Sequence, residues 1–268
     1  MPRPWRLACL LALLASATAT AGCLREYSAS NSAGLGYIAF LDDSGSPAGF
    51  SADFYRELGR RVGCKIRYEV LPPLRQNALA EHDLTALLVP VVSRTRPEHL
   101  FVPLLAIPLD LIIRRDLNVR TVSAAKANAN VVFGYISALS YGQWGNAFLD
   151  ALPKDRLDDT PTTDALYRKL AVGRIGATFG YAPMYRRNLD IYQLIDTVRI
   201  IPVEETPRTV MGLVIVHKQV PPADERQLRE AAESMRQDGT LARLLAHYLG
   251  DTVANDIVWR ASRDPVPQ

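Results

Sequence analysis

Cysteine, histidine and an excess of charge of one sign are all scarce in this sequence. It has three cysteines, and its four histidines stand far apart, at positions 82, 99, 217 and 247. A metal site needs several such ligands close together, so we expect no bound metal. Lys and Arg together number 31, against 28 Asp and Glu. Because a nucleic-acid-binding surface needs a clear excess of positive charge, we expect no nucleic-acid partner.

A long apolar run that could span a membrane is also missing. The opening segment, MPRPWRLACLLALLASATATAGC, has two arginines, a short apolar run and small residues near its end, which is the pattern of a secretory signal peptide. The run is much shorter than the roughly 20 apolar residues of a membrane-spanning helix. We therefore expect residues 1–22 to be a signal peptide and the rest of the chain to be secreted.

Two cysteines, Cys23 and Cys64, follow the predicted signal peptide. In an oxidising compartment such a pair favours a disulfide bond. A lipid on Cys23, with Cys64 left free, is one alternative, although lipoprotein signals usually have Leu where Thr20 stands. Two inert thiols are the other alternative.

Apolar residues recur with two different periods along the chain, which predicts alternating strands and helices. In GFSADFYRELGRRVG the apolar residues recur every four positions, which predicts an amphipathic helix capped by Ser51 and ended by Gly63. Residues 65–71 alternate polar and apolar side chains, as a half-buried strand does. The patterns also predict strands over 35–41, 84–92, 109–115, 130–136, 174–181, 199–203 and 210–218, and helices over 73–81, 140–152, 164–173 and, as a pair, 224–250. This order predicts two α/β lobes with largely parallel sheets.

Several short motifs follow one another in a specific order. They are GFSADFYRELGRRVG, HDLTALL, SRTRPEH, VGRI and MRQDGTLARLLAHYLG. Each is weak alone, but their order and spacing resemble the family 3 solute-binding proteins of bacterial ABC transporters, the polar amino-acid-binding group with the type II periplasmic binding fold. The resemblance covers nearly the whole chain after the signal peptide.

This resemblance implies an α/β protein of two lobes, each a largely parallel sheet flanked by helices, that close on a ligand about a hinge. The chain would cross between the lobes near Pro108 and near Val210, so that residues 23–108 and 210–268 form one lobe and 109–209 the other. The implied function is that of a monomeric, periplasmic, non-catalytic receptor. It would capture a small polar, carboxylate-bearing molecule for an inner-membrane ABC permease.

Two arginines are the first candidates for holding that ligand. In the family, the arginine of a T-P-E-R segment forms a bidentate pair with the ligand's carboxylate. Here SRTRPEH has His99 in that place, with Arg94 and Arg96 just upstream. We expect Arg96, or failing that Arg94, to be the anchor, with Ser93 donating to the same oxygens. The alternative is that both arginines are solvated and that Ser93 only forms a turn.

A second departure from the family concerns the ligand's amine. Where the family has x-G-R-x-D-A-x-x-x-D, this chain has VGRIGATFGY, with Gly176 and Tyr181 at the two acidic positions. A buried ammonium without a carboxylate is costly, so we expect a ligand without a free α-ammonium, unless Asp42 or Asp43 replaces the missing acid. Tyr181 would offer its ring and its hydroxyl to the ligand, or would pack under the hinge.

Four more positions complete the expected site. Ser140 and Tyr141 open a predicted helix whose amide end suits an anion; for Ser140 the alternative is a plain helix cap. Tyr37 lies near the family's ligand-stacking aromatic residue, with surface or core packing as its alternative. Arg75 is either a further donor or a solvated helix residue.

Other functions stay open beside the receptor. The same fold carries a secreted cyclohexadienyl dehydratase, which needs a general acid, but no acid in this sequence stands with a base and an oxyanion donor. No G-x-S-x-G, H-E-x-x-H or phosphate-binding loop occurs, so we expect neither enzymatic activity nor a cofactor. An adaptor or sensor component that binds no ligand is the third alternative.

Overall fold

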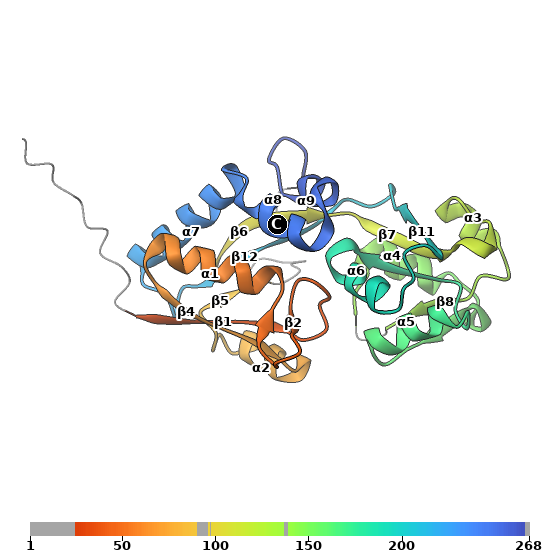
Figure 1. The fold of residues 1–268 in the computed structure, drawn as a ribbon, viewed down its shortest axis with the longest axis horizontal. Coiled ribbons are helices and arrows are strands. Elements are labelled where there is room, and N and C mark those ends of the chain that lie inside the picture. Colours follow the sequence, from red (N-terminus) through yellow and green to blue (C-terminus); the bar gives the residue numbers. More distant parts are fainter. Residues whose placement is uncertain (1–24, 90–95, 97, 137–138, 266–268) are drawn as a thin grey trace, which may run out of the picture.

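Two five-stranded sheets form the framework of the chain in a computed structural model, which describes residues 25–89, 96, 98–136 and 139–265. The first sheet has the strand order β4-β1-β5-β12-β6, and the second has the order β11-β7-β10-β8-β9. Figure 1 shows each sheet with its helices as a separate body, and the two bodies lie side by side. We call the body with the first sheet the first lobe and the body with the second sheet the second lobe.

The first sheet combines parallel and antiparallel strands. Its strand β1 pairs in parallel with β4 and β5, whereas β12 pairs antiparallel with β5 and β6. A short hairpin, β2 (Phe40–Leu41) and β3 (Pro47–Ala48), lies beside it. The bounds of the sheet strands are β1 (Glu26–Ser32), β4 (Lys65–Leu71), β5 (Leu87–Leu88), β6 (His99–Ile107) and β12 (Thr209–Val216).

The second sheet also combines parallel and antiparallel strands. In this sheet β10 and β9 both pair in parallel with β8, and β7 pairs antiparallel with β10 and β11. The bounds are β7 (Leu109–Arg114), β8 (Phe133–Tyr135), β9 (Leu157–Asp159), β10 (Ala177–Tyr181) and β11 (Val198–Pro202). The predicted fold class is confirmed, and every antiparallel pair in the two sheets involves a strand next to a passage between them.

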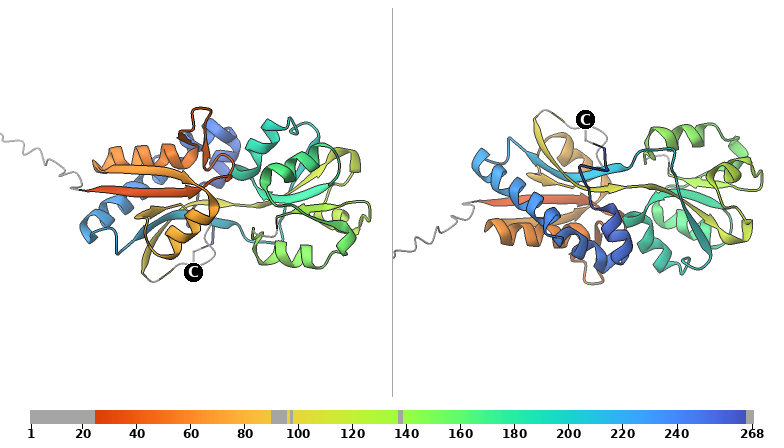
Figure 2. Two further views of the ribbon diagram at one scale, coloured as in Figure 1. Left: turned by 90° about the horizontal axis from the view of Figure 1, so that it is seen from below. Right: turned by 90° about the horizontal axis from the view of Figure 1, so that it is seen from above.

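Helices flank both sheets, as Figure 2 shows from two sides. In the first lobe they are α1 (Phe50–Val62), α2 (Pro73–Glu81), α7 (Pro222–Gln237), α8 (Thr240–Leu249) and α9 (Asp251–Ile257). In the second lobe they are α3 (Val122–Ala127), α4 (Gly142–Asp150), α5 (Thr163–Ala171) and α6 (Ala182–Ile191). Among the described residues, no helix is both long enough and apolar enough to cross a membrane.

The chain passes between the two sheets twice. One passage is the single residue Pro108, between β6 and β7, and the other is residues 203–208, between β11 and β12. These passages support the division that we propose, into a first lobe of residues 23–108 and 210–268 and a second lobe of residues 109–209.

One predicted strand is wrong. Residues 35–41 form turns and bends, with only Phe40–Leu41 in a strand. The first long strand is instead β1, whose sequence EYSASNS has few of the bulky residues that mark strands. Ile38 is fully buried although it lies outside any strand, so the apolar side chains of this segment belong to the core and not to a sheet.

The start of α1 also differs from the prediction. Gly49, at φ +102°, occupies the cap position that we assigned to Ser51. The amides of Phe50 and Ser51 instead donate to the carbonyl oxygens of Tyr37 and Ile38, at 2.8 and 3.0 Å. The turn segment therefore caps α1 with its backbone, which is why Ile38 is drawn into the core. The predicted end of α1 at Gly63, in the left-handed conformation, is confirmed.

The disulfide bond stays a prediction because Cys23 lies outside the described residues. Cys64 is buried directly before β4, and the next residue, Lys65, pairs with Glu26 of β1. Glu26 is only three residues after Cys23. We expect the unreduced mature protein to be lighter than the reduced protein by two hydrogen atoms, and reduction to lower its stability by about 3 kcal/mol. Intact-mass measurement decides this, and two alkylatable thiols or a lipid on Cys23 would contradict it.

Candidate ligand site at the lobe junction

The parallel strands of both sheets end at the junction between the lobes. In the first sheet, β12 starts at the second passage and runs antiparallel to β5, so β5 and its parallel neighbours β1 and β4 end on the side of the passages. In the second sheet, Tyr181 at the end of β10 pairs with Leu109, directly after Pro108. Open α/β sheets bind ligands outside the carboxyl ends of their strands. The junction is therefore the candidate site.

Tyr181 closes β10 at this junction and is 8% exposed. Its hydroxyl oxygen accepts a hydrogen bond from Thr209, at the start of β12, at 3.0 Å. Burial raises the pKa of Tyr181, so the phenol is uncharged at physiological pH. The second lobe thus presents a neutral side chain here, and its hydroxyl is tied to the returning passage.

The start of α4 lies beside Tyr181. A Cβ atom at Gly142, the first residue of α4, would lie 4.0 Å from the Tyr181 hydroxyl oxygen. The exposed Ser140 accepts a hydrogen bond from the Gly142 amide at 3.2 Å, and the hydroxyl of the buried Tyr141 accepts one from the Ile136 amide at 3.0 Å. Ser140 and Tyr141 therefore shape the turn that places the amide end of α4, which favours anions, next to Tyr181.

Tyr37 stands on the opposite side of the junction, in the first lobe. Its hydroxyl donates to Oδ2 of Asp190 in α6 at 2.6 Å. Its ring packs against Tyr248 with the ring centres 5.5 Å apart. Tyr37 thus already makes contacts to protein groups in both lobes.

Two buried amide side chains at the junction edge of the first lobe were not predicted. Asn31 lies near the end of β1 and Gln76 lies in the first turn of α2, where they are 4% and 9% exposed. The oxygens Asn31 Oδ1 and Gln76 Oε1 have no hydrogen-bond partner among the described residues. Because an unpaired buried acceptor is costly, both are candidate ligand contacts. Their neighbour Arg75 is exposed at the same edge.

The structure does not bring Arg96 to this junction. Its Nη1 lies 3.4 Å from Oδ1 of Asp83, which also contacts Nε2 of His99 at 2.7 Å. His99 opens β6 at the end of the first sheet that is remote from the passages. The negative charge of Asp83 therefore accounts for the position of Arg96. The remaining candidates of this segment, Ser93 and Arg94, lie outside the described residues.

The cluster around Asp83 contains the only set of potential metal ligands in the described part of the chain. Ligand atoms of Asp83, Glu98 and His99 lie within 4.8 Å of one another. Lys218 Nζ, however, lies 3.3 Å from Asp83 Oδ2, and Arg96 is also close. Two cationic side chains already neutralise the carboxylate, so the arrangement fits an ion-pair cluster better than a cation site.

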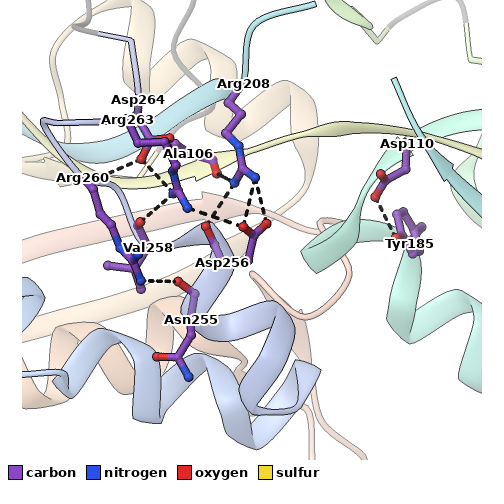
Figure 3. A network of polar contacts seen from close by, with 10 residues as sticks. All are labelled: Ala106, Asp110, Tyr185, Arg208, Asn255, Asp256, Val258, Arg260, Arg263 and Asp264. Carbon is purple, nitrogen blue, oxygen red and sulfur yellow. Dashed lines mark hydrogen bonds and ion pairs between the residues drawn. The ribbon is translucent and has the colours of Figure 1, made fainter. Parts of the chain in front are cut away.

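The second passage is held to the first lobe by charged residues (Figure 3). Nη2 of Arg208 lies 3.0 and 2.9 Å from the two carboxylate oxygens of Asp256, and Nη1 donates to the carbonyl oxygen of Ala106 at 3.2 Å. Asp110, just after the first passage, accepts a hydrogen bond from Tyr185 of α6 at 2.8 Å. Burial raises the pKa of Asp110 to about 6, and the Tyr185 hydrogen bond and the charge of Arg208 offset this only in part.

Gly176 is not part of the junction. It lies directly before β10, at the opposite end of that strand from Tyr181. A Cβ atom there would lie 2.8 Å from Cδ1 of Leu117, so the position belongs to the packed interior of the second lobe. Of the two positions where the family has acids, only Tyr181 therefore lies at the junction.

Comparison with known proteins identifies the fold. No family model and no curated protein matches the sequence. Among solved structures, an ABC uptake transporter substrate-binding protein from Streptococcus pneumoniae with bound histidine matches with a TM-score of 0.66 and 14% identity, covering 85% of this chain and 94% of that one. An ancestral arginine-binding protein bound to glutamine matches with a TM-score of 0.64 and 12% identity, covering 84% and 98%.

A third solved structure is the unliganded, open form of the L-cystine solute receptor of Neisseria gonorrhoeae. Its TM-score is 0.59 at 16% identity, covering 85% of this chain and 94% of that one. All three neighbours are binding proteins. The chain therefore has the two-lobed type II fold of amino-acid ABC uptake substrate-binding proteins, and the resemblance stated from the sequence is confirmed at the level of the fold.

Proposed function

We propose that this protein is a periplasmic, non-catalytic receptor that binds a small solute between its lobes and delivers it to an inner-membrane ABC permease. The observation that carries the proposal is the convergence of the parallel strands of both sheets on one junction that the chain crosses twice. This arrangement suits a site formed by two lobes that move as rigid bodies. One solved neighbour is a substrate-binding protein of an ABC uptake transporter and another is a solute receptor, which supports the same function. We propose that the receptor is a monomer, as one chain supplies both sides of the site.

The solute that we propose is a small carboxylate without a free α-ammonium group. The amide end of α4 lies beside Tyr181 and favours an anionic group. Tyr181 ends β10 where the resembling family has the aspartate that accepts an ammonium, and a neutral phenol cannot replace that charge. In its present place Arg96 does not contribute, so the carboxylate would depend on backbone amides, on Arg75, or on Ser93 and Arg94.

Thermal unfolding in the presence of a panel of small molecules tests the receptor function. A ligand at about 100 times its Kd stabilises the native state by about 2.7 kcal/mol, which should raise Tm by roughly 5–10 °C for a chain of this size. The panel should include carboxylates, the standard amino acids and sugars. If no member raised Tm, the adaptor or sensor role that binds no ligand would be favoured instead.

The specificity is tested by calorimetry with the amino acids and their deaminated analogues. We expect the deaminated acid to bind at least about tenfold more tightly than its amino acid, because the ammonium would lose its hydration without gaining a counter-charge. Tyr181→Asp should reverse this order, whereas Tyr181→Phe, which removes only the hydroxyl, should not. Tight binding of an unmodified amino acid to the natural sequence would contradict the proposal and would direct attention to the unpaired oxygens of Asn31 and Gln76.

A further inference from the structure

We infer that residues 36–40 of the first lobe and helix α6 of the second lobe form a latch that holds the two lobes together without a ligand. The latch joins segments that lie far apart in the sequence, since Tyr37 and Asp190 are separated by 153 residues. Each of its contacts joins a protein group of one lobe directly to a protein group of the other, with no ligand between them. The closed arrangement of the lobes therefore has a source of stability that is independent of any bound solute.

The backbones of the two lobes meet directly in the latch. The Tyr37 amide donates to the carbonyl oxygen of Pro183 at 2.7 Å. Gly36, at φ +60°, lies so close to Met184 that a Cβ atom would be 2.1 Å from its carbonyl oxygen. Only glycine allows this approach, because any side chain at this position would collide with the backbone of α6.

Side chains on both sides of Gly36 extend the contact. The Tyr37 hydroxyl donates to Asp190 at 2.6 Å, and burial, together with this acceptor, raises the pKa of Tyr37 to about 12. The guanidinium carbon of Arg187 lies 4.3 Å from the centre of the Phe40 ring, within the range of a cation–π contact. The latch thus combines a backbone hydrogen bond, a charge-assisted hydrogen bond and a stacked cation.

The first-lobe half of the latch is anchored to the body of its lobe. The Tyr37 ring packs on Tyr248 of α8, and the Tyr248 hydroxyl donates to Oδ2 of Asp53 in α1 at 2.7 Å. The carbonyl oxygens of Tyr37 and Ile38 hold the first amides of α1. Because the segment is fixed by α1 and α8, pulling α6 away would break the latch contacts and would not simply drag the segment along.

The latch should increase the affinity for a solute although it does not touch the solute. A ligand that binds the closed state has an apparent affinity proportional to the population of that state. Contacts that favour closure in the absence of ligand therefore increase the affinity without touching the ligand. The existence of the latch, however, does not depend on the receptor function, since it can be measured on the protein alone.

Two glycines of the same segment provide a matched pair of variants. Gly34 and Gly36 both have positive φ, +84° and +60°, so alanine is strained at either position. A Cβ atom at Gly34 has nothing within 4 Å, whereas one at Gly36 collides with Met184. Without ligand, we expect Gly36→Ala to increase the radius of gyration in small-angle scattering and Gly34→Ala to leave it unchanged. Identical scattering profiles for the two variants would overturn the latch.

Amide hydrogen exchange provides a second measurement, in case Gly36→Ala does not fold. In the ligand-free natural sequence, the Tyr37 amide should be protected because its acceptor, Pro183, belongs to the other lobe. Asp190→Ala and Tyr37→Phe should both increase exchange at this amide several-fold while leaving the amides of β1 unchanged. An unprotected Tyr37 amide in the natural protein, or exchange that neither variant changes, would refute the latch. If exchange rises as expected but no small molecule raises Tm, the latch stands and the receptor function fails.

Discussion

Replacing Arg156 by Ala should lower the free energy of unfolding by about 3 kcal/mol, because one buried guanidinium group holds three backbone carbonyl groups. Arg156 is 9% exposed. Its Nε donates to Val131 O at 3.0 Å, Nη1 donates to Lys126 O at 2.7 Å, and Nη2 donates to Ala125 O at 3.0 Å. The last two carbonyls belong to the final turn of α3, so Arg156 serves as a C-terminal cap supplied from a distant part of the chain.

Two further variants separate this role from the loss of a positive charge. Arg156→Lys keeps the charge but cannot reach three acceptors at once, so it should recover only part of the loss. Arg168→Ala is a control in the same lobe: its side chain is 67% exposed and pairs with Asp164, and its removal should change stability by less than about 0.5 kcal/mol. Urea unfolding followed by circular dichroism compares the three. Equal midpoints for the two alanine variants would show that the buried guanidinium contributes little.

The parts of the fold that the sequence predicted are those whose pattern is local. Helix α1 and strand β4 show clear periods of four and two residues, and each lies where its period placed it. Strand β12 is a mostly apolar run and β7 is apolar except for Asp110 and Arg114, and both strands are buried along nearly their whole length. For these elements the side chains alone determine which surface is buried, so no distant partner is needed to recognise them.

Not every element was predicted: strand β6 was missed although its sequence HLFVPLLAI is mostly apolar, and strand β1 was missed because it depends on partners far along the chain. Strand β1 is composed of small and polar residues, and it forms because β4 and β5 pair with it on both sides. Its buried Asn31 is accommodated because Nδ2 donates to the carbonyl oxygen of Val89 at 2.9 Å. Helix α6 was also not predicted, although it carries Tyr185 and the second-lobe half of the latch. Strand β1 has no local apolar period strong enough to predict it.

The candidate site shows the same limit. Tyr181 and the Ser140–Tyr141 turn lie at the junction, and their places could be predicted because strand ends and helix starts can be located from sequence. Arg96 does not lie there, because it pairs with Asp83, and local spacing does not indicate this partner. Asn31 and Gln76 gave no signal, since nothing near them in the sequence indicates that these polar side chains are buried.

Replacing Asp110 by Asn should stabilise the protein at neutral pH and leave its stability unchanged in acid. Asp110 is 5% exposed, and its carboxylate accepts one hydrogen bond from Tyr185. Burial raises its pKa from 3.8 to about 6; the Tyr185 hydrogen bond and the charge of Arg208 lower it, and the charge of Asp256 raises it further. Arg208 is bound to Asp256 and so leaves Asp110 without a direct counter-charge.

The direction of the effect follows from linkage between folding and protonation. A carboxyl whose pKa is higher in the folded than in the unfolded state binds its proton more tightly when the protein is folded. The contribution of this tighter proton binding to the stability of the folded state is therefore fully present below about pH 4 and is lost as the pH rises to about 6. Above that pH the cost reaches an upper bound of about 3 kcal/mol. Asn is uncharged at every pH and still accepts the Tyr185 hydrogen bond, so the variant should avoid this cost.

Urea unfolding at several pH values between 4 and 8 measures this difference, with Asp116→Asn as the control. Asp116 also lies in the second lobe, but its side chain is 60% exposed, and its hydrogen bond with Arg114 lowers its pKa. Its removal should therefore slightly reduce stability at neutral pH, opposite in sign to the effect at Asp110. If Asp110→Asn also lost stability at pH 7, Asp110 would be charged and paired in the folded state. In the described part of the chain, Arg208 is the cation whose charge acts on Asp110, and the second passage would then be bound to the second lobe as well as to the first.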